Sequence, residues 1–329
     1  MTRLGVTLPL GGLELHQHRE AIDRLSAAGY VDLWSGEVNG IDGLSQLALY
    51  AGWNDEIGIA CAVVNAFTRP PALLAMSAAA MGEIAPGRSR FGIGAGSNVI
   101  VQDWSGIPFT TPYTRVAETL EFMRTALRGE RSTSEYTTFA SNGFKLARLP
   151  AEPPKLVLAA LGPRMLTLAA NQADGVVLNF LSASDLERVR QVTDAVQRSE
   201  SRLELSARVF VVPGESSVAE SAARRHIAGY LTVPVYAQYQ RWLGREHELT
   251  PLWDAWSSGD RKGAMAAIPQ QVVNDLVLYG SPRDCATGIR RYVEHGLDAV
   301  TVLLMPPPDS DPSDQIDFLV DLANEMETQ

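Results

Sequence analysis

The sequence predicts a (β/α)8 barrel, in which eight parallel strands, each followed by a helix, close into a cylinder. Apolar strand-like segments alternate with amphipathic helical segments along almost the whole chain. The strand segments are apolar nearly throughout, which is typical of parallel strands buried on both faces. The 329 residues suit a single domain of this type over 1–329. An open, doubly wound parallel sheet is the alternative architecture.

The first four strand and helix units are expected within residues 4–127. Strands are predicted at 4–8, 31–35, 57–64 and 90–94. Helical spacing of apolar residues indicates which side chains of the intervening helices face the barrel. In chain order, the four helices are expected to bury Ile22, Leu25 and Ala28; Leu44, Leu47, Ala48 and Ala51; Leu73, Met76, Ala80 and Ile84; and Val116, Leu120, Met123 and Leu127.

The other four strands are predicted at 155–160, 175–179, 205–212 and 299–305. A helix is expected to begin near Pro163, because proline suits the first turn of a helix. The later helices are expected to bury Leu186, Val189 and Val196; Ile289, Tyr292 and Val293, with a stop at Gly296; and Ile316, Leu319, Val320 and Ala323.

Three insertions are expected, at about 97–112, 130–150 and 231–280. The second contains Asn142-Gly143 within an alternating pattern at 134–146, which predicts a β-hairpin. The stretch 219–277 is too long for one crossover and predicts several helical pieces. Its aromatic residues are expected partly to cover a flat ligand as a lid and partly to anchor the insertion itself. They are Tyr230, Tyr236, Tyr239, Trp242, Trp253 and Trp256.

Composition and charge narrow the classes of partner. The net charge of −10 argues against a nucleic-acid or anionic-membrane surface, since both require a basic face. Cys61 and Cys285 lie far apart in the sequence, which favours buried thiols in a reducing compartment. No signal-peptide core or apolar run of membrane-spanning length is found in the sequence. We therefore expect a cytoplasmic protein that acts on a small molecule.

The segment 90–97 is the predicted centre of the site. A short strand runs into Gly94-Ala95-Gly96-Ser97, where glycines let the backbone approach a cofactor closely. A dinucleotide-binding turn is a poor match, because Ser97 stands where that motif needs its third glycine. The residues that follow, 99–101 and Trp104, predict no helix whose dipole would hold a pyrophosphate.

In a barrel, functional groups gather where the strands end. The turn at 161–164 would direct backbone N–H groups and Arg164 at a phosphate, although an ordinary tight turn is the alternative. Glu37 is a general acid or base if its pocket perturbs it, and otherwise a solvated carboxylate. Asn65 can bond to the edge of a cofactor ring or simply cap the next helix.

Other chemistries find little support in the sequence. The five histidines are His16, His18, His226, His247 and His295, and none falls at a predicted strand end. No His, Cys, Asp or Glu cluster has the spacing of metal ligands, so no metal site is predicted. His16 and His18 are expected at the surface, whereas His226 can fold over the barrel mouth. A serine-hydrolase elbow and a cysteine–histidine pair are both missing from the sequence.

Four motifs resemble those of the bacterial luciferase-like superfamily. They are FGIGAGS at 91–97, VVNAFTRPPA at 63–72, AALGPRM at 159–165 and ADGVVLN at 173–179. Within the superfamily, the chain is most similar to coenzyme F420-dependent oxidoreductases related to methylenetetrahydromethanopterin reductase. The resemblance covers nearly the whole chain, but its motifs discriminate poorly between a deazaflavin and a flavin cofactor.

The resemblance implies a cofactor ring at the C-terminal mouth of the barrel, backed by a bulge in the third strand. In the family this bulge often contains a non-prolyl cis peptide bond, which here would fall near residues 63–65. The glycine-rich turn would also meet the ring, and 162–165 would hold the phosphate. The implied cofactor-binding residues are Thr7, Val63, Val64, Asn65, Gly94, Ala95, Gly96, Ser97, Asn98, Ala160, Leu161, Gly162, Pro163, Arg164, Met165 and Asn179.

The implied activity is transfer of a hydride between C5 of coenzyme F420 and a small organic substrate. Glu37 and Asn65 are the catalytic candidates. Relatives carry Asp or Asp-His at the end of the second strand, where this chain has Gly36-Glu37-Val38-Asn39, which argues against a sugar-phosphate dehydrogenase. The substrate and lid residues are expected to be Trp104, Phe109, Tyr113, Tyr230 and Tyr236, and Arg69, Arg164 and Arg283 are candidates for binding an acidic tail of the coenzyme.

Two alternatives remain beside this activity. The first is a luciferase-like monooxygenase that uses FMN, and the second is a flavin-binding protein without catalysis. Because family members commonly dimerise through barrel helices, a homodimer is also expected.

Overall fold

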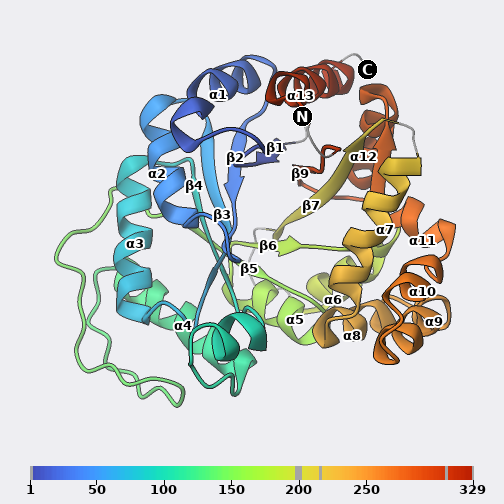
Figure 1. The fold of residues 1–329 in the computed structure, drawn as a ribbon. Coiled ribbons are helices and arrows are strands. Elements are labelled where there is room, and N and C mark those ends of the chain that lie inside the picture. The colour runs from blue at the N-terminus through green and yellow to red at the C-terminus, as the bar shows by residue number, and fades with distance from the viewer. Residues whose placement is uncertain (1–2, 197–201, 215–216, 308–309, 328–329) are drawn as a thin grey trace.

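The strands form a closed parallel barrel, as the sequence predicts (Figure 1). The computed structural model describes residues 3–196, 202–214, 217–307 and 310–327. Strand order is β6-β5-β4-β3-β2-β1-β9-β7, and pairing of β6 with β7 closes the cylinder. The strands are β1 (Arg3–Thr7), β2 (Asp32–Ser35), β3 (Gly58–Asn65), β4 (Ser89–Gly94), β5 (Lys155–Ala159), β6 (Gly175–Leu178), β7 (Glu204–Pro213), β8 (Val277–Gly280) and β9 (Ala299–Leu304).

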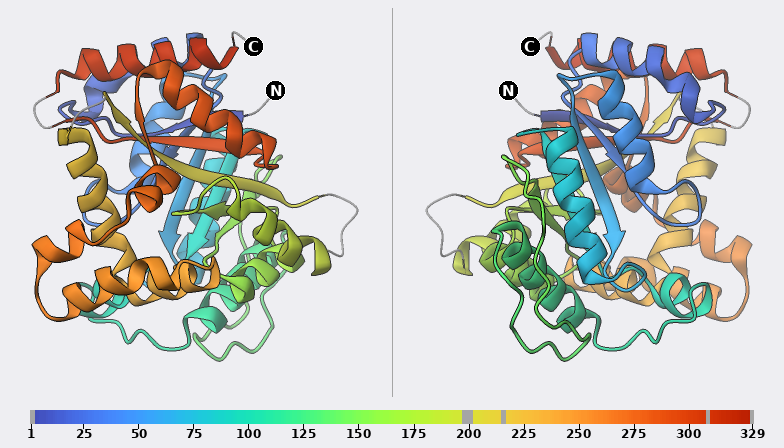
Figure 2. Two further views of the ribbon diagram at one scale, coloured as in Figure 1. Left: turned by 90° about the vertical axis from the view of Figure 1, so that its right-hand side faces the viewer. Right: turned by 90° about the vertical axis from the view of Figure 1, so that its left-hand side faces the viewer.

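Helices surround the barrel, and a group of them, α8 to α11, stands at one side (Figure 1). Figure 2 shows the arrowheads of the strands pointing to the end of the molecule where α8 and α9 lie. The helices are η1 (Leu15–Gln17), α1 (His18–Ala27), α2 (Gly43–Trp53), α3 (Pro71–Ile84), η2 (Val99–Asp103), α4 (Pro112–Leu127), α5 (Pro163–Gln172), α6 (Asp185–Val196), α7 (Ser217–Leu231), α8 (Pro234–Trp242), α9 (Glu246–Ser257), α10 (Arg261–Ala266), α11 (Gln270–Leu276), α12 (Pro282–Glu294) and α13 (Pro312–Glu327).

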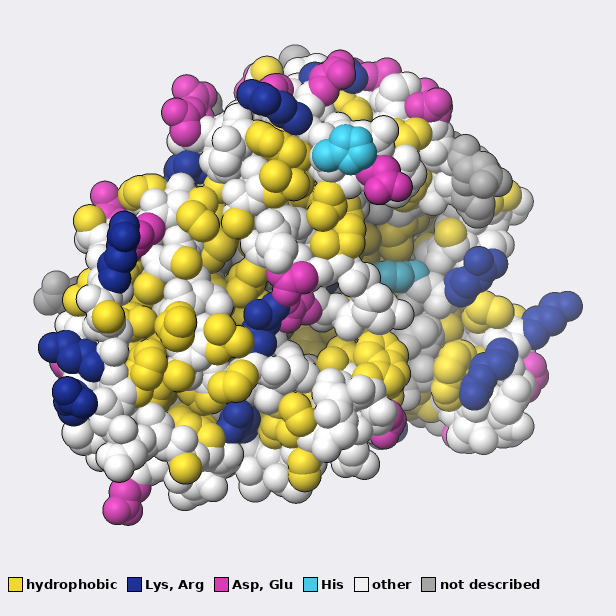
Figure 3. Space-filling model, turned by 60° about the vertical axis from the view of Figure 1, so that its left-hand side comes forward, with side chains coloured by type: hydrophobic (Ala, Val, Ile, Leu, Met, Phe, Trp, Pro, Cys, Tyr) yellow, Lys and Arg dark blue, Asp and Glu magenta, His cyan; other side chains and the backbone are white. Residues whose placement is uncertain are grey.

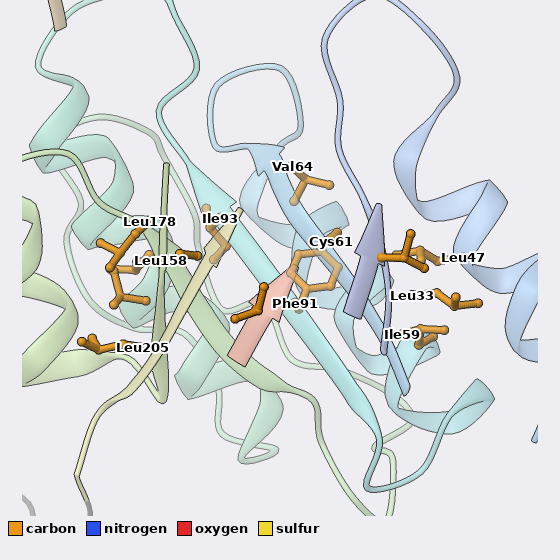
Figure 4. Packing of buried hydrophobic residues seen from close by; sticks show 14 of the residues in the cluster. Leu33, Leu47, Ile59, Cys61, Val64, Phe91, Ile93, Leu158, Leu178 and Leu205 are labelled. Atoms are coloured by element: carbon orange, nitrogen blue, oxygen red, sulfur yellow. The ribbon is translucent and has the colours of Figure 1, made fainter. Parts of the chain in front are cut away.

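The core has two layers, because successive side chains of a strand point to opposite faces. The outer layer lies between the strands and the helices and contains Leu33, Cys61, Phe91 and Leu158 (Figure 4). The inner layer fills the barrel lumen with a separate cluster built around Trp34. Burying each large apolar side chain stabilises the fold by roughly 1.5–3 kcal/mol before entropy is counted. The inner cluster is Trp34, Ala60, Val157 and Val177, with Ala62 packed against it.

The N-terminal end of the lumen is closed by a network of charges, which we call the barrel floor: Arg3, Asp32, Arg90 and Glu204. Arg90 Nη1 lies 3.2 Å from Asp32 Oδ1, and its Nε lies 2.8 Å from Glu204 Oε1. Arg3 Nη2 donates to Asp32 Oδ1 at 2.8 Å. Asp32 is 1% exposed and Arg90 is 5% exposed, so these charges neutralise one another out of contact with water.

The buried face of α3 differs from the predicted one. Leu73, Met76, Ala80 and Ile84, which the spacing assigns to the core, are exposed, with Met76 53% exposed. The helix is apolar almost all the way round, so the sequence has no polar face to fix its rotation. The residues that α3 buries are Pro71, Leu74, Ala75, Ala78, Ala79, Met81 and Gly82.

The predicted hairpin at 134–146 is wrong. Residues 128–154 form no strand, although Ser132 exchanges backbone hydrogen bonds with Gly143 and Phe144. Tyr136, Phe139 and Phe144 all pack against Phe122 of α4, at ring-centroid distances of 5.4–5.9 Å. This segment is therefore held by packing against α4 and not by the strand pairing that its alternating pattern predicted.

Three smaller predictions also need correction. A short strand, β8, ends the insertion predicted at 231–280, where no strand was expected, and it pairs with the end of β7. A helical turn, η2, begins at Val99, where none was expected. His18 is fully buried and not on the surface, because its Nε2 accepts a hydrogen bond from Leu10 N at 2.9 Å and its Nδ1 lies 3.0 Å from Glu14 O.

Candidate active site

One wall of the barrel mouth consists of nearly bare backbone. The lumen-facing residues of β3, β4 and β5 at this level are Ala62, Gly92, Gly94 and Ala159. A Cβ atom on Gly94 would lie 2.6 Å from Val63 Cγ2, and one on Gly92 would lie 2.1 Å from Cys61 O. Only glycine therefore fits beneath the bulged strand β3.

The bulge in β3 lies where the family resemblance implies it. The register with β4 shifts between Cys61 and Val64, and the Ala62–Val63 peptide bond is cis. The expectation of a non-prolyl cis bond near residues 63–65 is thus confirmed. Val64 turns outward into the core, whereas Val63 stays half-buried at the mouth.

Asn65 ends β3, and the sequence left open whether it caps the next segment or bonds to a cofactor ring. Its Oδ1 accepts a hydrogen bond from Phe67 N at 2.7 Å, so it caps the turn that follows. Its Nδ2 is buried and has no hydrogen-bond partner among the described residues. Gly96, at φ +71°, approaches so closely that a Cβ atom there would lie 1.9 Å from Nδ2. An unsatisfied buried donor of this kind costs free energy unless a ligand accepts its hydrogen bond.

The turn at 94–98 continues from this wall. Ser97 Oγ accepts a hydrogen bond from Ile100 N at 3.4 Å and so begins η2. Ala95 is half-buried against the core and Asn98 is exposed. On the neighbouring side, Thr7 at the end of β1 has a buried Oγ1 without a partner.

The predicted phosphate turn has the geometry of an anion site. Gly162, at φ +85°, precedes α5, and Pro163 occupies the first turn of that helix. The first N–H groups of a helix have no acceptor within it, and the helix dipole favours an anion there. Arg164 is exposed and its Cζ lies 4.6 Å from the ring centroid of Tyr113. Ala160 and Leu161 connect β5 to this turn, and Met165 packs partly against the core.

The opposite wall is bulky and aromatic. Asn179 Nδ2 donates to the Tyr236 hydroxyl at 3.2 Å. Phe180 follows in a left-handed conformation at φ +51° and lies 4.7 Å from the Tyr230 ring and 5.4 Å from the His226 ring. Burial raises the pKa of Tyr236 to about 12 and lowers the pKa of His226 to about 4, so both are neutral near pH 7. His226 packs against Phe180, Phe210 and Tyr230, and its place over the mouth stays a prediction.

The aromatic residues of the predicted lid separate into groups. Tyr230 and Tyr236 pack edge to face at 5.4 Å beside Phe180, whereas Trp104 is 54% exposed. Phe109 packs against Phe67 at 5.2 Å. Tyr239 stacks on Trp242, and both pack with the outer core. Trp253 and Trp256 pack against a further buried cluster, which is formed by residues of α7, α9, α10, α11, β7 and β8.

Glu37, the predicted proton-transfer group, lies in an ion pair. Arg69 donates from Nη2 to Glu37 Oε1 and to Asp42 Oδ2, and its Nε lies 3.3 Å from Glu37 Oε2. Arg69 is therefore engaged within the chain, while Arg164 and Arg283 are exposed. The ion pair fixes the position of the Glu37 carboxyl group, which follows the end of β2.

Sequence reasoning missed Arg208 of β7, which lies under the mouth. Its Nη2 donates to Ala62 O, the carbonyl that precedes the cis bond, at 2.8 Å. The available signal was a single charged residue inside the otherwise apolar strand segment 205–212.

Figure 3 shows that the molecule is hollowed on one face and that hydrophobic side chains and a histidine lie inside the hollow. Within the described ranges, three or more His, Cys, Asp or Glu side chains are nowhere grouped so as to hold a metal ion. The helices in those ranges include none that is long and apolar enough to span a membrane.

Comparison with known proteins gives consistent relatives. The model of the family described as luciferase-like monooxygenase matches residues 1–299. A 5,10-methylenetetrahydromethanopterin reductase of Methanolobus tindarius is 27% identical over 284 residues, which are 83% of this chain and 85% of that protein. An F420-dependent hydroxymycolic acid dehydrogenase of Mycobacterium tuberculosis is 26% identical over 66% of this chain and 61% of its own. The solved structure of coenzyme F420-dependent tetrahydromethanopterin reductase from Methanopyrus kandleri covers 97% of both chains with a TM-score of 0.74 at 19% identity.

Proposed function

Because the chain belongs to the luciferase-like monooxygenase family, we propose that it is a coenzyme F420-dependent oxidoreductase that transfers a hydride between C5 of the deazaflavin and a small organic substrate. The named relatives include reductases and dehydrogenases that depend on this coenzyme. The observation that carries the proposal is the bare wall at Gly92, Gly94 and Ala159, next to the unpaired Nδ2 of Asn65. A planar ring needs a flat surface and a hydrogen-bond donor at its edge, and this wall offers both.

The residues present fit such a cofactor. We assign the ring to the surface formed by Val63, Asn65 and 94–98, with Thr7 Oγ1 as a further unpaired polar group. We assign the phosphate to 160–165, where Arg164 adds a positive charge to the start of α5. When bound, the deazaflavin supplies the hydride chemistry, and the protein supplies position, electrostatics and exclusion of water.

The chain's own residues would then perform three tasks. Asn65 Nδ2 orients the ring edge through a hydrogen bond. Glu37, positioned by its ion pair with Arg69, accepts a proton from an alcohol or returns it to the carbonyl. Tyr230 and Tyr236 cover the mouth and keep water away from the reacting atoms.

Titration of tryptophan fluorescence tests the proposal, since Trp34 lies in the lumen below the mouth. We expect quenching at micromolar or lower concentrations of oxidised coenzyme F420, and weaker quenching by FMN. Asn65→Ala is expected to weaken coenzyme binding about tenfold, the value of one hydrogen bond to a buried donor. Gln172→Ala, on the exposed end of α5, is the matched control and should leave the affinity unchanged.

Two results would contradict the proposal. Preference for FMN, together with oxygen consumption in the presence of reduced FMN, would favour the monooxygenase alternative, which the name of the family supports. Binding without turnover of carbonyl, imine and enone substrates would favour a non-catalytic flavin-binding protein. Binding of neither cofactor would remove the assignment of the ring and phosphate sites.

We further propose a homodimer formed through α3. Leu73, Met76 and Ile84 expose 39–53% of their area on this helix. Figure 3 shows hydrophobic side chains gathered on the face of the molecule that comes forward from the α3 side. Met76→Lys is expected to convert the dimer to a monomer in light-scattering measurements, whereas Val218→Lys, at an exposed site on α7, should leave it a dimer. The cytoplasmic location stays a prediction.

A further inference from the structure

Arg208 projects into the barrel lumen. Along β7, the alternate residues Leu205, Ala207, Val209 and Val211 belong to the outer core between strands and helices. Arg208 lies between these residues in the alternation of the strand, so its side chain points from the other face. It is half-buried at this position, which leaves part of it accessible.

The hydrogen bond from Arg208 crosses the lumen. In the closed strand order, β7 and β3 are separated by three strands in either direction, so the two strands face each other across the barrel. The bond from Arg208 Nη2 to Ala62 O, at 2.8 Å, therefore spans the full width beneath the mouth. A Cβ atom on Gly36, at the end of β2, would lie 3.4 Å from the same Nη2. The guanidinium is thus directly below the proposed ring site.

Arg208 has no counter-ion in the described part of the chain. No carboxylate of residues 3–196, 202–214, 217–307 or 310–327 forms an ion pair with it, and its buried Nε has no hydrogen-bond partner. Tyr230, Tyr236 and His226 interact with it electrostatically, and burial raises the pKa of Tyr236 to about 12 and lowers the pKa of His226 to about 4. A charge withdrawn from water costs several kcal/mol unless it is paired.

We infer that Arg208 binds a carboxylate of the substrate, so that the substrate is an organic acid whose acidic end enters the lumen first. The planar guanidinium matches a carboxylate with two parallel hydrogen bonds, and its free Nε is one of the required donors. Tyr230, Tyr236 and Phe180 line the same side and favour an apolar or aromatic body. The inference rests on the proposed function, because it names the substrate class of the same site. Because the phosphate of the coenzyme is already assigned to 160–165, we assign the anion at Arg208 to the substrate and not to the coenzyme.

Calorimetric titration of the whole chain without coenzyme tests the assignment. The probes are benzoate, phenylacetate and 3-phenylpropionate, each compared with its uncharged amide. We expect the best carboxylate to bind at least about tenfold more tightly than its amide. Arg208→Gln should weaken carboxylate binding about 10- to 100-fold and leave amide binding unchanged, because hydrogen bonds to charged groups contribute more than neutral ones. Arg208→Lys keeps the positive charge but not the planar guanidinium, so it should lose less carboxylate affinity than Arg208→Gln.

The outcomes separate this inference from the proposed function. Equal binding of acids and amides, or Arg208→Gln that binds acids as the natural chain does, would overturn the carboxylate site. Arg208→Gln that weakens binding of coenzyme F420 but not of the carboxylates would also overturn it, because the anion would then belong to the coenzyme. If the chain binds no F420 but binds acids more tightly than amides, and Arg208→Gln abolishes this preference, the carboxylate site is supported and the proposed function is removed. Arg148→Gln, at an exposed site, is the control for nonspecific charge effects.

Discussion

Each end of the barrel lumen contains an arginine, and the two arginines differ in whether the described chain supplies a carboxylate partner. At the barrel floor, Arg90 meets Asp32 and Glu204, and Arg3 adds a second cation on Asp32. At the mouth, Arg208 meets a backbone carbonyl and neutral side chains, with no carboxylate partner among the described residues. A cation that the chain neutralises itself stabilises the fold, whereas a cation left without an anion is available to bind one.

The floor is where we expect the largest effect of a single substitution on stability. Asp32→Ala removes the carboxylate that Arg3 and Arg90 share, and Arg90, which is 5% exposed, keeps Glu204. Breaking a buried pair by removing one partner typically costs about 3–5 kcal/mol of the free energy of unfolding. Urea denaturation followed by circular dichroism measures this loss.

The control for this substitution is an ion pair on the surface. Glu83→Gln removes the partner of Arg148, which is 83% exposed, and should cost less than about 1 kcal/mol. A loss below about 1 kcal/mol for Asp32→Ala as well would mean that the floor is not stabilised by its charges, and the contrast between the two ends would fail.

The second largest effect is expected at the mouth, where backbone contact replaces ion pairing. Gly96→Ala would force a residue with a Cβ atom into φ +71° and place that atom 1.9 Å from Asn65 Nδ2. We expect a loss of about 1–3 kcal/mol in stability, from strain of this kind, together with weaker binding of coenzyme F420. Thermal unfolding and fluorescence titration measure the two quantities.

Gly52→Ala provides the matched comparison. Gly52 lies in the last turn of α2, with nothing among the described residues within 4 Å of its Cβ position, so alanine should stabilise the helix by up to about 0.5–1 kcal/mol. Equal effects of the two substitutions would show that the close approach of Gly96 to Asn65 does not matter.

The same two regions mark what the sequence can and cannot predict. The barrel and its strand ends follow from local patterns, because apolar segments and glycine-rich turns are read from neighbouring residues. The rotation of α3 was missed because its uniformly apolar surface carries no local signal. The pairing of Arg90 with Glu204 and the isolation of Arg208 depend on strands more than 100 residues apart. Contacts between residues so far apart in the sequence form when the barrel closes, and the spacing of neighbouring residues does not predict them.

Titration of His226 at the mouth is expected to change the stability of the fold by an intermediate amount. Burial lowers the pKa of His226 at the mouth to about 4, from an ordinary value near 6.5. Between these two pH values the unfolded chain binds a proton at His226 and the native chain does not, so stability falls as the pH is lowered through this window. The slope is at most about 1.4 kcal/mol per pH unit for one histidine.

Urea denaturation between pH 7 and pH 4.5 measures this slope. His226→Gln should make the profile shallower, and His295→Gln, at an exposed site directly after α12, should leave it unchanged. The buried His18 contributes in the same direction, because burial lowers its pKa as well. A profile that is unaltered by His226→Gln would mean that this histidine is not desolvated by the aromatic wall.

The smallest change in the free energy of unfolding is expected for Arg208→Met, and this substitution tests the comparison between the two ends of the lumen most directly. Arg208→Met removes a hydrogen bond to Ala62 O, worth about 0.5–1.5 kcal/mol, but it also removes the cost of holding an unpaired cation away from water. These terms oppose each other, so the free energy of unfolding should change by less than about 1 kcal/mol, in contrast to Asp32→Ala. Urea denaturation of both variants under one set of conditions makes the measurement. A loss above about 3 kcal/mol for Arg208→Met would show that Arg208 holds the barrel together as Arg90 does, and an arginine needed for the fold in that way would no longer be evidence for an acid at the mouth.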